Sequence, residues 1–466
     1  MSALSTTVID DAGSRSELRA TLALAVPVAA VQVGFMGMGV VDALMIGRAG
    51  AAPLAAVALG NLYFFNAAII ATGTLMALDP VVAQAIGARD HAAVSRAVQR
   101  GLVLTVLLTV FTWLLLAPIG WVLRATHQQP DIVPDAAAYV RISAFGALPY
   151  IAFVVLRQSL QALQRVGPIL WTVLIANTTN AGLNWVFIYG HLGSPALGVR
   201  GSATATAISR WVMALVLLAL GWRELRPCIF PLRREALHLR PLGRMLHLGV
   251  PIGLQQFLES GAFGAIGLMM GVLGTVQMAA HQIAITLASL TFMVPLGVSS
   301  AAAVRVGRAV GSGDADRARQ ASRAAYLCGV GFMCTTALLF LTLAVPLARA
   351  FTIDGRVIAV AATLIPVAGV FQVFDGGQAV GAGVLRGLGD TRAPLVAMLA
   401  GYWLIGLPVS VWLGFHTPLR ATGLWWGFVA SLGSVALFLA WRVRRLFGRD
   451  LRRVVVDEEH SLAEAV

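Results

Sequence analysis

The run from Ser260 to Val304, SGAFGAIGLMMGVLGTVQMAAHQIAITLASLTFMVPLGVSSAAAV, contains no Asp, Glu, Lys or Arg. A membrane-spanning helix needs only about 20 apolar residues, so a run of this length must cross a bilayer twice. The glycines Gly271 and Gly274 mark the turn between the two crossings. The stretch therefore predicts two spanning helices rather than the core of a water-soluble domain.

Long uncharged runs recur along the whole chain, which is 58% hydrophobic and only 12% charged. Such a composition cannot cover a water-facing surface with polar groups. We therefore expect an all-α polytopic membrane protein with about 12 transmembrane helices. The expected spans are 20–47, 54–78, 97–120, 134–156, 168–190, 201–222, 245–271, 279–302, 321–346, 357–384, 394–414 and 421–441.

The formal net charge of +13 comes entirely from arginines, and they are not spread evenly. Alternate connections between the expected spans are rich in arginine, and the connections between them carry far fewer. This is the positive-inside pattern, so it predicts a multi-pass protein of the bacterial inner membrane with both termini in the cytoplasm, and no nucleic-acid partner. The arginine-rich segments are 89–100, 157–165, 223–244, 305–323, 386–392 and 442–453.

An internal repeat divides the chain into two halves. Gly87-Ala-Arg-Asp90 and Gly311-Ser-Gly-Asp314 are 224 positions apart, the same spacing that separates Pro27 from Pro251. Both copies lie in arginine-rich connections, so they predict a parallel repeat of six spans each with a binding cleft between them. The expected organisation is a tail (1–19), a first lobe (20–222), a linker (223–244), a second lobe (245–441) and a second tail (442–466).

Two carboxylates of the second half are expected inside the membrane, where a charge is unfavourable by at least about 2.5 to 3.5 kcal/mol. Glu259 lies fifteen positions past Arg244, roughly 22 Å along a helix. Asp375 is followed by Gly376 and Gly377, which loosen a helix and expose carbonyl groups. We interpret Glu259 and Asp375 as a proton or sodium site; pairing with a buried arginine is the structural alternative. Gln378 is expected to line the cavity.

The first half offers a second polar set. Asp42 is a further candidate for proton or cation coupling. It stands among glycines and methionines, which suit an adaptable cavity, although a position near the helix end would let its charge reach water. Asn180 and Asn184 share one helix face. We expect them to bind a ligand; hydrogen bonds between helices are the structural alternative. Arg210 is an intramembrane cation and a candidate counter-ion, and Asp79 is expected near a helix end or gate.

The sequence contains no phosphate-binding loop, metal-binding His/Cys cluster or nucleophile elbow. An enzyme is therefore not expected, no cofactor is implied, and an ion gradient or the solute itself must drive any transport. A membrane enzyme would need a paired catalytic constellation near one membrane face.

Several motifs resemble those of the multidrug and toxic compound extrusion family, in particular its NorM-like branch. The resemblance runs from about Leu22 to Trp441. The motifs in the first half are Asp42 in Val-Asp-x-x-Met, Val82-Ala-Gln84, Asn184-Trp-Val-Phe-Ile-Tyr-Gly190 and Gly201-Ser-Ala-Thr-Ala-Thr206. Those in the second half are Gly249-Val-Pro-Ile-Gly253, Glu259, Ala279-Ala-His-Gln-Ile283, Pro295-Leu-Gly-Val-Ser299 and Gly311-Ser-Gly-Asp314.

The resemblance implies two six-helix lobes that open alternately to either side. It implies a monomer in membrane lipid that exports cationic or amphipathic drugs against an inward flow of H⁺ or Na⁺. Asp42, Asn180 and Asn184 would form the polar site of one lobe, and Glu259 and Asp375 that of the other, with Na⁺ possible at this pair.

One residue departs from the family pattern. Sodium-coupled members commonly carry a tyrosine one helical turn before the second-lobe aspartate, where this chain has Phe371. The missing hydroxyl favours H⁺ and leaves Na⁺ open. The runner-up function is a flippase for a lipid-linked or polysaccharide precursor, which would be expected to carry more cationic residues in its cavity.

Overall fold

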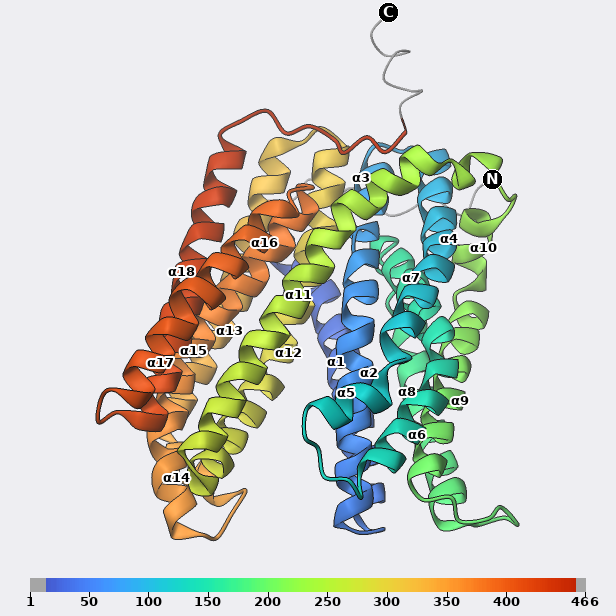
Figure 1. Ribbon diagram of the computed structural model, residues 1–466. Helices are drawn as coiled ribbons and strands as arrows, with labels where there is room; N and C mark the ends of the chain where they lie inside the picture. Colours follow the sequence, from blue (N-terminus) through green and yellow to red (C-terminus); the bar gives the residue numbers. More distant parts are fainter. Residues whose placement is uncertain (1–13, 458–466) are drawn as a thin grey trace, which may run out of the picture.

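The computed structural model describes residues 14–457, and every regular element in that range is a helix (Figure 1). Eleven helical stretches are long and apolar enough to cross a membrane. α8 (Gly167–Tyr189) lies beside α1 and α9 but carries three asparagines, which lower its hydropathy. With α8, the expected twelve crossings are accounted for, and the all-α polytopic fold is confirmed.

The helices form two lobes joined by a short basic segment. The first lobe contains α1 (Ser14–Gly47), α2 (Ala51–Leu75), α3 (Leu78–Gly87), α4 (His91–Leu116), α5 (Ile119–Ala125), α6 (Val133–Ser143), η1 (Ala144–Gly146), α7 (Ala147–Ala162), α8 and α9 (Val199–Leu220). The connection holds α10 (Trp222–Ile229) and η2 (Arg234–Leu237). The second lobe contains α11 (Leu239–Leu273), α12 (Thr275–Gly311), α13 (Ala315–Thr342), α14 (Ala344–Arg349), α15 (Gly355–Gly387), α16 (Arg392–Met398), η3 (Leu399–Gly406), α17 (Leu407–Phe415) and α18 (Arg420–Phe447).

The long uncharged run folds back as its glycines predict. α11 ends at Leu273, and α12 begins at Thr275. Between them Gly274 has a φ of 133°, a left-handed conformation that a residue with a side chain rarely adopts. This single glycine therefore turns the chain through the hairpin that joins the first two crossings of the second lobe.

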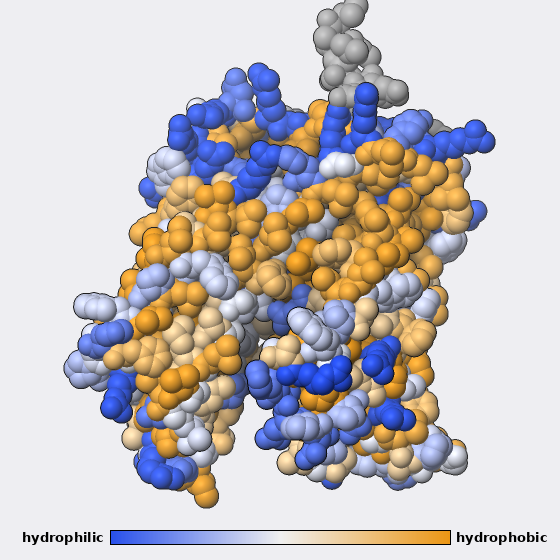
Figure 2. All heavy atoms as spheres, viewed as in Figure 1, coloured by the Kyte–Doolittle hydropathy of each residue, from blue (hydrophilic) through white to orange (hydrophobic). Residues whose placement is uncertain are grey.

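The two lobes meet at one end and separate at the other. In Figure 1 the first lobe (blue to green) and the second lobe (yellow-green to red) converge at the top, and Figure 2 shows a notch between them that opens at the bottom. Hydrophilic residues cover the closed end, and an apolar belt surrounds the middle of the molecule (Figure 2). We call the closed end the basic face, because the arginine-rich connections α3–α4, α12–α13 and α15–α16 lie there.

The repeated Gly-x-x-Asp segments form equivalent structures in the two lobes. Asp90 accepts a hydrogen bond from the Ala93 amide at 2.9 Å and so begins α4, and Asp314 accepts one from the Arg317 amide at 2.8 Å and begins α13. Each is therefore the N-cap of the next helix. The sequence repeat is thus also a structural repeat.

The glycines of these segments lie at the crossing between the lobes. A Cβ on Gly87 would lie 2.0 Å from the Arg308 carbonyl oxygen of α12, and one on Gly311 would lie 2.0 Å from the Gln84 oxygen of α3. Only glycine allows the two backbones to approach so closely. The end of α3 and the end of α12 therefore pack directly on each other at the basic face.

Ion pairs also join the lobes near this face. Asp79 of α3 and Arg386 of α15 form a buried pair with Oδ2 and Nη1 3.2 Å apart. Glu17 of α1 is paired with Arg305 and Arg317 of the second lobe. α1 begins at Ser14, six residues before the expected span, and this extra turn carries Glu17 to its two arginines.

Candidate functional site in the two lobes

The polar set of the first lobe comes together as the sequence indicates. Asn184 of α8 donates a hydrogen bond from Nδ2 to Oδ1 of Asp42 on α1 at 2.5 Å, and the same nitrogen lies 3.1 Å from Oδ1 of Asn180. Both asparagine side chains are fully buried. Because an acidic oxygen held by a buried amide keeps its remaining lone pairs available, Asp42 can receive a proton or a cationic ligand.

Two further side chains act on Asp42. Asn180 and Thr206 of α9 lie close enough to donate hydrogen bonds to its carboxylate. Oδ1 of Asn184 is buried and has no hydrogen-bond partner among the described residues. Because buried polar groups are normally paired, this oxygen can accept a hydrogen bond from a polar group of a ligand.

Arg210 lies in the same lobe but does not form an ion pair with Asp42. Its guanidinium stacks over the Phe64 ring at 3.8 Å and donates to the Ser143 carbonyl oxygen at 3.4 Å. A second ring, Tyr150, lies 5.4 Å away. The arginine is thus held mainly by cation–π contacts, and it acts on Asp42 only through its charge.

The second lobe brings Glu259, Asp375 and Gln378 together. Gln378 of α15 donates from Nε2 to Oε1 of Glu259 on α11 at 3.5 Å. Asp375 lies one turn earlier on α15, is 5% exposed, and has an oxygen, Oδ1, without a partner. Glu259 and Asp375 are near enough to repel each other when both are charged. The arrangement therefore has too few donors for two ionised carboxylates.

Phe371 lies one turn before Asp375 on α15. Its ring is fully buried and packs against Phe263 at 6.0 Å, Trp425 at 5.4 Å and Phe428 at 5.6 Å. Phe263 in turn contacts the Tyr402 ring. Phe371 thus belongs to an aromatic cluster next to the carboxylates, and its ring offers them no hydroxyl group.

Tyr402 is a member of the site that the sequence did not indicate. It lies in η3, a π-helical turn from Leu399 to Gly406, and its hydroxyl donates to Oε1 of Glu259 at 3.4 Å. Its side chain is 1% exposed. The only sequence signal is that Tyr402 stands within the uncharged run from Ala393 to Leu419. This signal does not predict which carboxylate the tyrosine contacts.

Comparisons with known proteins agree with this architecture. The MatE family model matches residues 27–186 and 251–412, and the two matches start 224 positions apart, the spacing of the internal repeat. A probable multidrug resistance protein NorM of Mesorhizobium japonicum is 38% identical over 440 residues, covering 92% of this chain and 94% of that protein. The multidrug resistance protein NorM of Burkholderia vietnamiensis is 38% identical over 430 residues, covering 91% and 92%.

A solved structure shows the same fold. It is the outward-facing conformation of a multidrug resistance MATE family transporter of the MOP superfamily, with a TM-score of 0.84 and 20% identity. The similarity covers 93% of this chain and 97% of that one. Together with the family match and the 38% identical relatives, this result assigns the family: the chain belongs to the MatE family of multidrug and toxic compound extrusion transporters.

Proposed function

We propose that this protein exports cationic or amphipathic drugs from the bacterial cytoplasm in exchange for H⁺ or Na⁺. The names of its NorM relatives support the drug substrates. The second-lobe carboxylates support the cation coupling. The protein would act as a monomer in membrane lipid, with residues 20–222 and 245–441 as its lobes and 223–244 as the linker.

The observation that carries the proposal is the buried carboxyl of Asp375, which has an unpartnered oxygen and lies close to Glu259. Two buried carboxylates with so few donors are unfavourable unless a proton or a metal cation neutralises one of them. Glu259, Asp375, Gln378 and Tyr402 could hold such a cation through oxygen atoms. A bare Na⁺ and a proton are both compatible with these groups.

The first lobe supplies the complementary negative group for a cationic drug. Asp42 is held by Asn184, and the unpartnered Oδ1 of Asn184 can accept a hydrogen bond from a polar group of a ligand. Neutralising a carboxylate in either lobe changes which helices it holds and so biases the lobes between their two arrangements. Binding of the coupling cation would thereby favour release of the drug.

The arginine distribution supports an orientation with the basic face and both termini in the cytoplasm of the inner membrane. The lobes are joined at the basic face and separated at the other end (Figure 2). In this orientation the structure corresponds to a state open to the outside. Drug release and cation entry would occur through the notch.

The test measures ethidium export from proteoliposomes under an imposed proton gradient and, separately, an imposed sodium gradient. Asp375→Asn and Glu259→Gln should reduce cation-driven export by at least about tenfold, since each removes a group that the cation must neutralise. Asp316→Asn is the control, because its side chain is 82% exposed on α13. Full-rate export by both carboxylate variants would overturn the proposal, and ethidium movement under neither gradient in the wild type would favour a flippase.

A further inference from the structure

A π-helical turn brings two neighbouring side chains of η3 onto the same stretch of α11. Tyr402 donates to the Glu259 carboxylate at 3.4 Å, and Trp403 donates from Nε1 to the Leu258 carbonyl oxygen at 3.2 Å. The Leu407 amide bonds to the Tyr402 carbonyl oxygen, which widens the turn beyond that of an α-helix. The wider turn lets residues 402 and 403 both face α11.

The π-helical turn is also fitted tightly against α18. A Cβ on Gly401 would lie 2.2 Å from the Val435 side chain, and one on Gly406 would lie 2.5 Å from the Ser431 side chain. Gly401 and Gly406 thus allow η3 to lie between α11 and α18. A turn held on both sides can place the Tyr402 hydroxyl at a definite position.

We infer that Tyr402 is a positioning residue of the coupling site. Its hydroxyl holds the Glu259 carboxylate and thereby sets the cation concentration at which Glu259 binds the coupling ion. The inference rests on the proposed coupling function. Phe371 offers no hydroxyl, so Tyr402 supplies the phenolic group at this site. The titratable groups that act on Glu259 are Asp375 of α15 and Tyr402 itself, and α12 places His281 beside Gly267, two turns further along α11.

The experiment compares Tyr402→Phe with Trp403→Phe. Each variant loses one donated hydrogen bond to neighbouring residues of α11, but only the first bond reaches a carboxylate. The readout is the external cation concentration, as pH or Na⁺, that gives half-maximal ethidium export, recorded separately from the maximal rate and the ethidium KM.

Tyr402→Phe should move the half-maximal cation concentration about threefold to tenfold, and Trp403→Phe should leave it unchanged. With H⁺ as the coupling ion the shift is towards lower proton concentration, because a lost donor disfavours the ionised carboxylate. With Na⁺ the shift is towards higher sodium concentration, because an oxygen ligand is lost. An unchanged cation dependence in Tyr402→Phe would overturn the inference. If Glu259→Gln still lost cation-driven export in that case, the proposed function would stand without a role for Tyr402.

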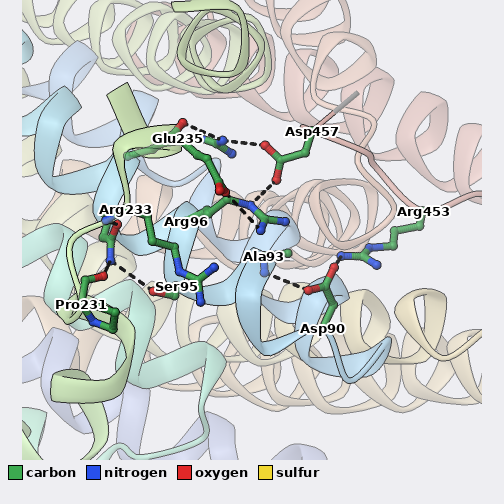
Figure 3. Close-up of polar contacts among 11 residues, drawn as sticks. Asp90, Ala93, Ser95, Arg96, Pro231, Arg233, Glu235, Arg453 and Asp457 are labelled. Carbon is green, nitrogen blue, oxygen red and sulfur yellow. Dashed lines mark hydrogen bonds and ion pairs between the residues drawn. The ribbon is translucent and has the colours of Figure 1, made fainter. Parts of the chain in front are cut away.

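A second, independent feature is the segment that follows α18, Gly448–Asp457, which we call the strap. It leaves the second lobe at Phe447 and runs across the basic face to the first lobe (Figure 1). Asp457 is paired with Arg96 at 2.7 Å and with Arg100 at 2.5 Å, both on α4. Figure 3 shows Arg96 between Asp457 of the strap and Glu235 of η2, and Arg100 donates to the Glu235 carbonyl oxygen at 3.2 Å.

Other strap contacts lie directly over the seam between the lobes. Arg453 is paired with Asp90 at 3.1 Å (Figure 3). The Val454 amide donates to Oε1 of Gln84 on α3 at 2.7 Å, and Nε2 of the same glutamine donates to the Gly387 carbonyl oxygen of α15 at 2.9 Å. The strap is therefore attached to both lobes at the place where they touch.

The strap is held by polar and apolar contacts together. Val456 belongs to the hydrophobic core, and Leu451 and Val454 pack against it. A hollow of about 510 Å³ stays open between the strap, at Val454–Val456, and the first turns of α11. Because each of these contacts contributes only modestly, the attachment can form and break within a transport cycle.

We propose that the strap is a latch that stabilises the closed basic face and must detach before the lobes separate there. Its test is a distance distribution between spin labels on Arg89→Cys and Ser312→Cys, exposed residues in the α3–α4 and α12–α13 turns, after replacement of Cys228, Cys328 and Cys334. Asp457→Asn, Arg453→Gln and truncation after Phe447 are compared with Arg452→Gln, whose side chain is exposed in the same strap.

Each single charge variant should raise the long-distance population about twofold to fivefold, the effect expected for one or two partly buried ion pairs. Truncation should raise it further, and Arg452→Gln should match the wild type. Distance distributions of the truncated protein and of the charge variants that all coincide with the wild type would overturn the proposal.

Discussion

At the scale of single residues, the carboxylates of the two lobes differ in their hydrogen-bond donors. Asp42 accepts a short hydrogen bond from Asn184, whereas one oxygen of Asp375 has no donor. Under the proposed function, Asp375 would receive the coupling proton or cation, and Asp42 would attract the cationic drug.

This difference predicts the behaviour of Asn184→Ala. The variant removes a hydrogen bond to a charged oxygen, which contributes about 1.5 to 3 kcal/mol, so the apparent affinity for ethidium should fall by about tenfold or more. Asn177→Ala is the matched control on α8, because Asn177 donates to the backbone oxygens of Gly34 and Val173. Equal effects of the two variants in a transport titration would contradict a specific role for Asn184.

The strap has a predictable response to pH. Burial alone would raise the pKa of Asp457, but hydrogen bonds from Arg100 and Arg96 outweigh it and hold the pKa below the ordinary value of 3.8. A carboxyl group whose pKa is lowered by folding stabilises the strap at any pH above its ordinary pKa. This stabilisation is lost as the pH falls through the lower pKa of the folded protein. The effect of Asp457→Asn on the spin-label distances should therefore be the same from pH 8 to about pH 5, and a change in that effect near neutral pH would contradict this assignment.

Part of each site could be predicted from residues alone. A carboxylate within an uncharged run is conspicuous, and the i, i+4 spacing of Asn180 and Asn184 indicates one helix face. Tyr402 could not be assigned in this way, because its contact depends on a π-helical turn and on the packing of that turn against α18. Arg210 remains a counter-ion candidate, because its guanidinium stacks on the Phe64 ring and still acts on Asp42 through its charge.

At the scale of helices, hydropathy and glycine placement predicted most of the elements. The hairpin at Gly274 is where the sequence indicates. Most spans agree with the helices within six residues, whereas α12 continues to Gly311, nine residues beyond the expected end at 302. The expected second span, 54–78, ends just before Asp79 and Pro80, whereas helix α3 continues the crossing to Gly87. The charge of Asp79 suggested the end of the span. Its ion-pair partner, Arg386, lies 307 positions away, so the neighbouring sequence does not reveal that the charge is paired.

The caps of the repeated turns predict a local stability effect. Asp314→Ala removes the side chain that accepts from the Arg317 amide, which should lower the free energy of unfolding by about 1 kcal/mol. Asp316→Ala, two residues later, loses only an exposed ion pair with Arg319 and should change it by less than about 0.5 kcal/mol. Thermal unfolding in detergent compares the two, and a larger loss in Asp316→Ala would contradict the capping assignment.

At the scale of the whole molecule, the two lobes are joined at the basic face by glycine crossings, buried ion pairs and the strap. These contacts belong to one arrangement of the lobes, because they must break when the basic face opens. The internal repeat makes this geometry possible, since equivalent turns from the two lobes meet there. The spacing of the repeat was visible in the sequence, whereas the lobe arrangement follows only from the packing.

The pair of Asp79 and Arg386 predicts a shift between the arrangements. Asp79→Asn leaves Arg386 buried without its carboxylate, a change worth about 3 to 5 kcal/mol. Because water reaches the arginine when the lobes part, the spin-labelled basic face should open more often in the variant. Asp79→Asn with Arg386→Gln removes both charges and should restore much of the closed population, and an unchanged closed population in the single variant would contradict a gate role for the pair.

We propose that the buried carboxylates of the second lobe couple a cation gradient to drug export. This coupling can be measured as ethidium export from proteoliposomes that contain either the wild type or Asp375→Asn, under a proton gradient alone and a sodium gradient alone. One of the two gradients should drive export by the wild type, and Asp375→Asn should lose this response while still binding ethidium. Equal gradient-driven export by the two proteins would show that Asp375 does not take part in coupling.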